Sequence, residues 1–175
     1  MQAIEFWKTV TMDQSGMLER FLQVLRGTGV PFCVIGGQAV NAYVEPLVSL
    51  DLDIAVAAAM LDRVRTELQR HFTVEEFPHS INASSPGSDL RVQLQKDPRY
   101  GDFPSRAEKR AVLGLELPVA AVEDVMRGKV WAAGDPGRRP SKRQKDLADI
   151  SRLLEAYPHL SALVPQRIRE RLETA

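Results

Sequence analysis

The feature that most constrains this chain is a pair of carboxylates inside an otherwise apolar segment. Residues 50–56 have the sequence LDLDIAV, which is typical of a buried strand except at Asp51 and Asp53. In an extended strand, residues i and i+2 point to the same face, roughly 7 Å apart along the chain. Asp51 and Asp53 therefore project together, while Leu52 and Ile54 face the core. The sequence predicts a strand with two carboxylates side by side.

Two like charges at this separation repel, and each raises the pKa of the other unless a cation lies between them. Mg²⁺ is the hard cation that combines carboxylate ligands with phosphate oxygens. The alternative is a solvent-exposed strand face whose two carboxylates bind nothing. We interpret the pair as a candidate magnesium site with Asp51 and Asp53 as ligands.

A glycine pair, Gly36 and Gly37, ends fourteen residues before the first aspartate. It lies between a short apolar strand predicted at residues 30–35 and a short helix predicted at residues 40–44. Glycines between a strand and a helix let the backbone approach a ligand closely, so the pair is a candidate phosphate cradle. The alternative is a tight turn without a ligand. The pair lacks the Gly-Lys-Ser/Thr ending of a P-loop and the third glycine of a dinucleotide fingerprint, which sets those two folds aside.

The remaining patterns predict a mixed α/β body followed by helices. A capping box at residues 11–14 precedes the first helical pattern. The predicted helices cover residues 18–25 and 60–68, the predicted strands cover residues 50–56, 72–77 and 90–94 with one or two more within 111–119, and residues 82–88 form a polar loop. From residue 122 onward the periodicity is only helical, with a break at residues 134–140. We therefore predict an α/β core over residues 1–119 and a helical C-terminal extension over residues 120–175.

Composition disfavours several classes of protein. Lysine plus arginine equals aspartate plus glutamate at 23 each, so the formal net charge is zero and a generic nucleic-acid coat is disfavoured. No apolar run approaches the ~20 residues that span a membrane. The N-terminus lacks a signal-peptide pattern, and the single cysteine, Cys33, cannot form an internal disulfide. These features predict a cytoplasmic protein without a membrane partner.

Lys129 lies within the apolar stripe of the helix predicted from residue 122. The stripe consists of Val122, Val125, Met126, Val130 and Ala133. At about 100° per residue, Lys129 falls in the middle of this stripe. An inward lysine must either extend its amine to solvent or pair with an anion, such as a phosphate or a buried carboxylate.

The last motif, residues 145–150, has the sequence KDLADI. Asp146 lies at the edge of the apolar arc of its helix and is a candidate partner for Lys129, whereas Asp149 lies outside the arc and is expected at the surface. Residues 127–145 contain seven basic residues and one acidic residue. This charge bias indicates either a solvated connection between helices or a phosphate or RNA footprint.

A strand, a Gly-Gly turn, a short helix and a strand with Asp-x-Asp, in that order, resemble the minimal nucleotidyltransferases of the DNA polymerase β-like superfamily. The tail is similar to that of the AbiEii-type toxin nucleotidyltransferases, with Lys129 as an inward lysine and residues 145–150 as a later Lys-Asp helix. The resemblance covers residues 28–157. It implies a small mixed-sheet nucleotidyltransferase core with a C-terminal helical extension.

The resemblance also implies an activity. A Mg²⁺-dependent enzyme of this kind moves a nucleoside monophosphate from an NTP to a protein, RNA or small-molecule acceptor, here in a toxin–antitoxin or abortive-infection setting. It implies two Mg²⁺ ions on Asp51 and Asp53, and Lys129 as a third catalytic residue. The implied nucleotide-binding residues are Gly36, Gly37, Gln38, Ser49, Gln93, Lys145 and Asp146.

Two departures from the family pattern support an alternative. The third carboxylate that the family supplies from a neighbouring strand is replaced by Gln93, and an amide is a poor Mg²⁺ ligand and cannot act as a base. One of the two metals is therefore expected to bind weakly, although Asp89 shares the strand parity of Gln93 and could face the site. The usual arginine and threonine before Asp-x-Asp are replaced by Leu47 and Ser49. The alternative is a catalytically impaired module of the same fold that binds nucleotide or a partner protein.

Overall fold

The computed structural model describes residue 5 and residues 16–173 of the 175-residue chain. The capping box predicted at residues 11–14 lies outside these described residues. None of the described helices is long and apolar enough to cross a membrane.

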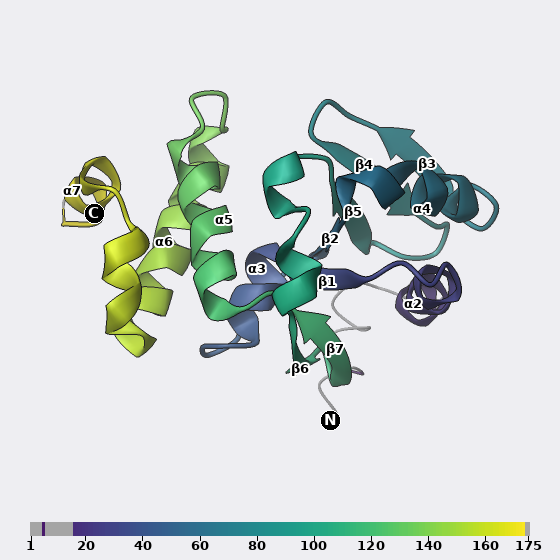
Figure 1. Ribbon diagram of the computed structural model, residues 1–175, viewed down its shortest axis with the longest axis horizontal. Helices are drawn as coiled ribbons and strands as arrows, with labels where there is room; N and C mark the ends of the chain where they lie inside the picture. The colour runs from purple at the N-terminus through teal and green to yellow at the C-terminus, as the bar shows by residue number, and fades with distance from the viewer. Residues whose placement is uncertain (1–4, 6–15, 174–175) are drawn as a thin grey trace.

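A seven-stranded mixed sheet forms the centre of the molecule, in the order β3-β4-β5-β2-β1-β7-β6 (Figure 1). The strands are β1 Phe32–Ile35, β2 Asp51–Val56, β3 Thr73–Glu76, β4 Ser80–Ser84, β5 Arg91–Gln95, β6 Glu108–Val112 and β7 Leu115–Val119. Strand β2 pairs antiparallel with β1 and parallel with β5. The predicted mixed α/β class is confirmed.

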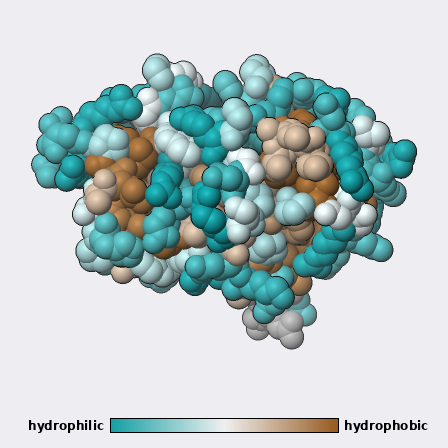
Figure 2. All heavy atoms as spheres, in the orientation of Figure 1, coloured by the Kyte–Doolittle hydropathy of each residue, from teal (hydrophilic) through white to brown (hydrophobic). Residues whose placement is uncertain are grey.

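Helices lie at both ends of the molecule, on either side of the sheet (Figure 1). They are α2 Met17–Gly27, α3 Gly36–Asn41, α4 Leu61–Leu68, α5 Val122–Gly134, α6 Pro140–Ala156 and α7 Gln166–Glu173, with short 3₁₀ turns η1 Ala58–Met60, η2 Pro98–Tyr100, η3 Phe103–Arg106 and η4 Pro158–Leu163. Helices α2 and α4 lie near β3 and β4, whereas α5, α6 and α7 gather at the opposite end (Figure 1). Two apolar areas on this face are separated by a hydrophilic band (Figure 2).

The alternation of β2 determines which side chains form the core. Leu52 and Ile54 are fully buried, and they pair in register with Val92 and Leu94 of β5. Because side chains alternate along a strand, the two carboxylates of β2 point to the other face. This is the arrangement that their two-residue spacing predicts.

Strand β4 occupies part of the segment predicted as a polar loop, residues 82–88, and this prediction is wrong for residues 82–84. The strand lies between β3 and β5, and it buries Ile81 and Ala83. Serine, asparagine and alanine have low strand propensity, so its short alternation is hard to recognise. Pairing with β5 on one side and β3 on the other stabilises it.

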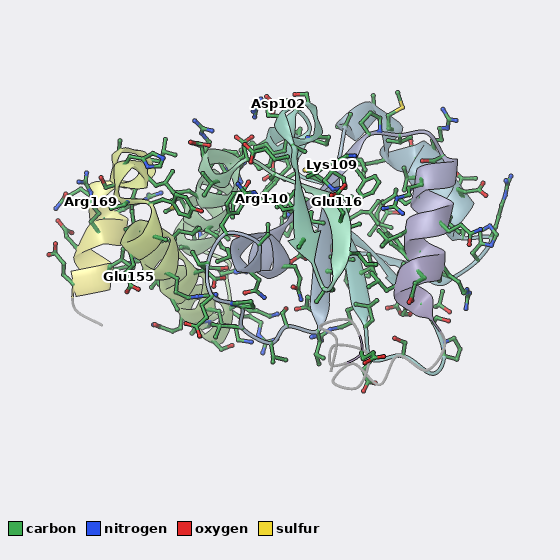
Figure 3. The ribbon with its side chains drawn as sticks, turned by 90° about the horizontal axis from the view of Figure 1, so that it is seen from below. Asp102, Lys109, Arg110, Glu116, Glu155 and Arg169 are labelled. Carbon is green, nitrogen blue, oxygen red and sulfur yellow. The ribbon has the colours of Figure 1, made fainter. Side chains whose placement is uncertain are left out.

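The β6–β7 hairpin anchors the segment that follows α3. The Arg110 guanidinium lies 3.9 Å from the centre of the Tyr43 ring. The Tyr43 hydroxyl donates a hydrogen bond of 2.8 Å to the carbonyl of Ala120. Across the hairpin, Lys109 pairs with Glu116 at 3.6 Å, and these labelled side chains lie on the paired strands in Figure 3. The two contacts of Tyr43 hold the end of α3 against the sheet.

Candidate active site

Gly36 is the first residue of α3 and lies directly against Asp53. Its φ is +66°, and a Cβ at this position would lie 2.9 Å from the Asp53 Cγ and 3.0 Å from the Asp53 Cβ. Ile35, the residue before it, pairs in register with Asp53. Helix α3 therefore begins at the glycine pair itself, without a separate turn, and only glycine fits at its first position.

We expect Gly36→Ala to destabilise the protein and to displace the Asp53 carboxylate. The left-handed backbone alone costs a non-glycine residue of order 1–3 kcal/mol, and the close carboxylate adds to this. Chemical unfolding measures the stability. Gly37→Ala is the matched control, because the nearest atom to its new Cβ would be the Ser49 Oγ at 3.9 Å, an ordinary contact. Equal losses in the two variants would contradict the argument.

The charge on Asp53 is unfavourable in the absence of a cation. Burial and the neighbouring Asp51 raise the pKa of Asp53 to about 6, although the charges of Lys129, Lys142 and Arg138 act in the opposite direction. A carboxylate with a raised pKa beside a second carboxylate gains from any cation placed between them. The electrostatics therefore fit a cation site.

Asp51 is approached by two cations from other elements. The Lys142 Nζ lies 3.3 Å from one carboxylate oxygen, Oδ2. The Arg91 Nε lies 2.8 Å from the other oxygen, Oδ1, but without the geometry of a hydrogen bond. Oδ1 is therefore a buried oxygen that accepts no hydrogen bond from the described residues. An oxygen of this kind calls for an additional partner, and a metal ion is one that fits.

Gln93 occupies the position beside Asp53 on the neighbouring strand. It pairs in register with Asp53 on one side and with Asn82 of β4 on the other. Its side chain lines a cavity together with Asp53, and no hydrogen bond joins it to another described side chain. Asp89 is exposed in the loop before β5 and is not among the described residues that line the site. The expectation that Asp89 could replace the third carboxylate is therefore wrong.

The described part of the chain contains no group of three or more histidine, cysteine, aspartate or glutamate side chains that could hold a metal ion. The site offers two carboxylates and one amide. Two carboxylates combined with phosphate oxygens are a suitable ligand set for one Mg²⁺.

Lys129 is buried on α5 and pairs with two carboxylates of α6. Its Nζ lies 2.7 Å from the Asp149 Oδ2 and 3.1 Å from the Asp146 Oδ1. Burial acts to lower the pKa of Lys129, but the charges of Asp149 and Asp146 outweigh it and raise the pKa. Arg138 and Arg152 each bind one of these aspartates at 2.8 Å.

The pairing of Lys129 with Asp146 agrees with the position of Lys129 in the apolar stripe. The expectation that Asp149 lies at the surface is wrong, because Asp149 is buried. Residues i and i+3 of a helix lie on neighbouring parts of its surface, so Asp149 follows Asp146 toward α5. The apolar residues of α6 alone do not predict the burial of Asp149, because its partner Lys129 lies on α5.

Gln38 and Asn41 of α3 hold the loop that leads into β2. The buried Gln38 donates a hydrogen bond of 3.1 Å from its Nε2 to the carbonyl of Ser49. Asn41 binds both backbone groups of Leu47, accepting at 3.0 Å and donating at 2.6 Å. The structure thus places Gln38 behind the site, whereas Ser49 contributes to a cavity wall.

Two cavities open on the site and share four residues, which we call the junction: Asp53, Lys129, Arg138 and Asp146. The sheet-side cavity has a volume of about 140 Å³ and lies over β4 and β5. The helix-side cavity has a volume of about 200 Å³ and lies between the loop before β2 and helix α6. Gly36 lines the first cavity, and Gly37 and Lys145 line the second.

Comparison with known proteins gives a likeness in structure only. No family model and no curated protein sequence matches the chain. The solution structure of the antibiotic-resistance factor ANT(2'')-Ia matches with a TM-score of 0.62 at 15% identity, over 93% of this chain and 96% of that one. The crystal structure of ANT(2'')-Ia in complex with adenylyl-2''-tobramycin matches with a TM-score of 0.59 at 15% identity, over 90% of this chain and 98% of that one. The crystal structure of the lincosamide antibiotic adenylyltransferase LnuA, lincomycin-bound, matches with a TM-score of 0.52 at 11% identity, over 80% of this chain and 98% of that one.

The fold is nucleotidyltransferase-like. The expected fold class is confirmed at this level, and the finer resemblance to AbiEii-type toxins stays a prediction. The sequence predicts Lys145 and Asp146 near the site but does not single out Arg138, Lys142 or Arg152. The charge bias of residues 127–145 is the signal that indicates Arg138 and Lys142, since both lie within that segment.

Proposed function

We propose that this chain is a Mg²⁺-dependent nucleotidyltransferase that moves a nucleoside monophosphate from an NTP to an acceptor hydroxyl. The observation that carries the proposal is the contact between Gly36 and Asp53, next to a second carboxylate with a buried oxygen that accepts no hydrogen bond from the described residues. The likeness to ANT(2'')-Ia, solved with adenylyl-2''-tobramycin, and to the adenylyltransferase LnuA supports this class of reaction. It favours a small-molecule acceptor over the RNA and protein acceptors of a toxin–antitoxin or abortive-infection system.

The side chains of the site have separable roles in this reaction. Asp51 and Asp53 would hold Mg²⁺, which supplies charge neutralisation at the triphosphate. Lys142, now paired with Asp51, and Arg138 would bind phosphate oxygens through charge-assisted hydrogen bonds. Lys129 keeps Asp146 and Asp149 in place by its two ion pairs. The Gln93 amide would orient an acceptor hydroxyl but cannot take its proton.

The position of Gln93 favours a second candidate function. With an amide in the place of a third carboxylate, the protein would bind MgNTP and transfer the nucleotide slowly or not at all. It would then act as a nucleotide-binding module or as the partner of another protein.

Thermal unfolding with MgNTP tests the proposed function. A ligand present at 100 times its Kd stabilises a protein by about 2.7 kcal/mol, so at least one of the four NTPs should raise the melting temperature clearly. The double substitution Asp51→Asn with Asp53→Asn should remove this shift. No shift with any NTP at millimolar concentration would refute the site.

Unfolding of the single variant Asp53→Asn without Mg²⁺ is the stability control for the Asp53 half of that double substitution. Because the folded-state pKa of Asp53, about 6, exceeds its ordinary value of 3.8, the folded state prefers the protonated carboxyl. The stability that this group contributes is present below about pH 4 and is lost as the pH rises to about 6. At pH 7.5 the metal-free Asp53→Asn variant should therefore be at least as stable as the wild type. A large loss of stability would mean that the missing shift reflects misfolding.

A further inference from the structure

The two cavities differ in the charge of their walls. The helix-side cavity adds Lys142, Lys145 and Arg152 to the junction, together with the carboxylates of Asp51 and Asp149. The sheet-side cavity adds only Asp124 among the described charged side chains. Because a triphosphate is strongly anionic, the helix-side cavity is the one that fits it. The sheet-side cavity is left for the second reactant.

A polar strip runs along the floor of the sheet-side cavity. It consists of Ser80 on β4 and of Gln93 and Gln95 on β5, which lie on one face because Ser80 pairs in register with Gln95. The Gln95 Oε1 accepts hydrogen bonds from the backbone N–H groups of Lys96 and Asp97, at 3.0 and 3.1 Å. A backbone N–H can only donate, so these bonds fix the orientation of the amide and leave its NH₂ group as a donor.

Aromatic rings form the apolar wall of the same cavity. The ring centres of Tyr100 and Phe103 lie 5.1 Å apart, and Trp131 packs against both. The Tyr100 hydroxyl donates to the carbonyl of Gly128 at 3.3 Å, which uses its proton within the protein. What this wall offers a ligand is the small exposed part of the Tyr100 ring, supported from behind by the fully buried Phe103, beside the amides of the strip.

We infer that the sheet-side cavity is the acceptor pocket and that it takes a small, neutral, hydroxylated ring, with Gln95 as a specificity-determining residue. The inference rests on the proposed function. The C–H face of such a ring packs on Tyr100, and its hydroxyl oxygens accept from the amide donors. Anionic acceptors are disfavoured, because the two described cations that line the pocket, Lys129 and Arg138, already pair with Asp146.

The reaction then takes place at the junction, where the two cavities meet. The acceptor oxygen forms a bond to the α-phosphorus, and the bond from that phosphorus to the β-phosphate oxygen breaks. Pyrophosphate leaves with the electron pair, and the hydroxyl proton passes to water, because the Gln93 amide cannot accept it. The small volume of the pocket favours a single ring over a polypeptide or an RNA strand.

Ligand-observed NMR on the full chain tests the pocket, with Mg²⁺ and a non-hydrolysable ATP analogue present. The probes are methyl glucoside, myo-inositol and uridine, with glucose 6-phosphate as the anionic comparison. We expect at least one neutral probe to bind more tightly than glucose 6-phosphate. Binding of methyl glucoside or myo-inositol would indicate a sugar-like acceptor. Binding of uridine alone would indicate a nucleoside acceptor.

Gln95→Glu is the decisive variant, because it keeps oxygen acceptors for Lys96 and Asp97 but removes the NH₂ donor and adds a charge. The variant should weaken the binding of the neutral probe at least about tenfold and leave the shift in melting temperature with MgNTP unchanged. Gln69→Glu, on the exposed end of α4, makes the same change away from the site and should alter neither.

The outcomes separate this inference from the proposed function. An MgNTP shift with no neutral probe bound, or with a probe that binds Gln95→Glu equally well, would overturn the acceptor pocket and leave nucleotide binding intact. Transfer of labelled nucleotide to RNA, with no probe labelled, would overturn it in favour of a macromolecular acceptor. If a neutral probe binds in a way that depends on Gln95 but the protein binds no MgNTP, the result would support the pocket and refute the proposed transferase activity.

Discussion

Lys129→Ala should lower the free energy of unfolding by about 3–5 kcal/mol, the usual cost of truncating one partner of a buried charge pair. The lysine side chain is only 10% exposed, and its Nζ lies within 3.1 Å of both Asp146 and Asp149. Arg138 and Arg152 remain on these aspartates in the variant, but they are more exposed than Lys129 and each contacts only one of them. Urea unfolding followed by tryptophan fluorescence measures the effect.

Lys145→Ala is the matched control, since Lys145 lies on the exposed side of α6. It should change stability by less than about 0.5 kcal/mol, as is usual for surface positions. A double-mutant cycle of Lys129→Ala with Asp149→Ala should show a clear coupling energy. A loss below about 0.5 kcal/mol for Lys129→Ala would show that the lysine is not part of a buried pair.

The sequence predicts best where the information is local. The alternation of Asp51 and Asp53 with Leu52 and Ile54 sets the faces of β2 within four residues. The helical period alone turns Lys129 inward, and its register does not depend on the rest of the fold. Both features could therefore be derived before any tertiary contact was known.

The parts of the site that the sequence did not predict depend on contacts between distant segments. Lys142 reaches Asp51 across 91 residues, and the neighbour of Asp51 on β5 is Arg91. No periodicity encodes such a pair, because the partner is chosen by how α6 and β5 dock on β2. The same reason explains why the sequence wrongly predicts Asp149 at the surface, since its partner Lys129 lies on another helix.

Gln93→Asp should strengthen Mg²⁺ binding and raise or create nucleotidyl transfer. Gln93 is the in-register neighbour of Asp53 on the adjacent strand, where backbones lie about 4.8 Å apart. A carboxylate here would add a third negative charge beside the pair on β2. Mg²⁺ would bind more tightly, and the site would gain a group able to accept the acceptor's proton, a contribution of roughly 10²–10⁴ in rate for general base catalysis.

The same substitution should destabilise the metal-free protein, because a third like charge raises the pKa of Asp53 further and its repulsion is relieved only by protonation or by a cation. Gln93→Asn is the control, since it keeps a neutral amide and shortens the side chain. Labelled NTP incubated with the neutral ring compounds, total RNA and total protein measures transfer by the wild type and both variants. If the wild type transfers nucleotide well and Gln93→Asp abolishes the transfer, the amide is a working part of the active site, and the catalytically impaired alternative has to be dropped.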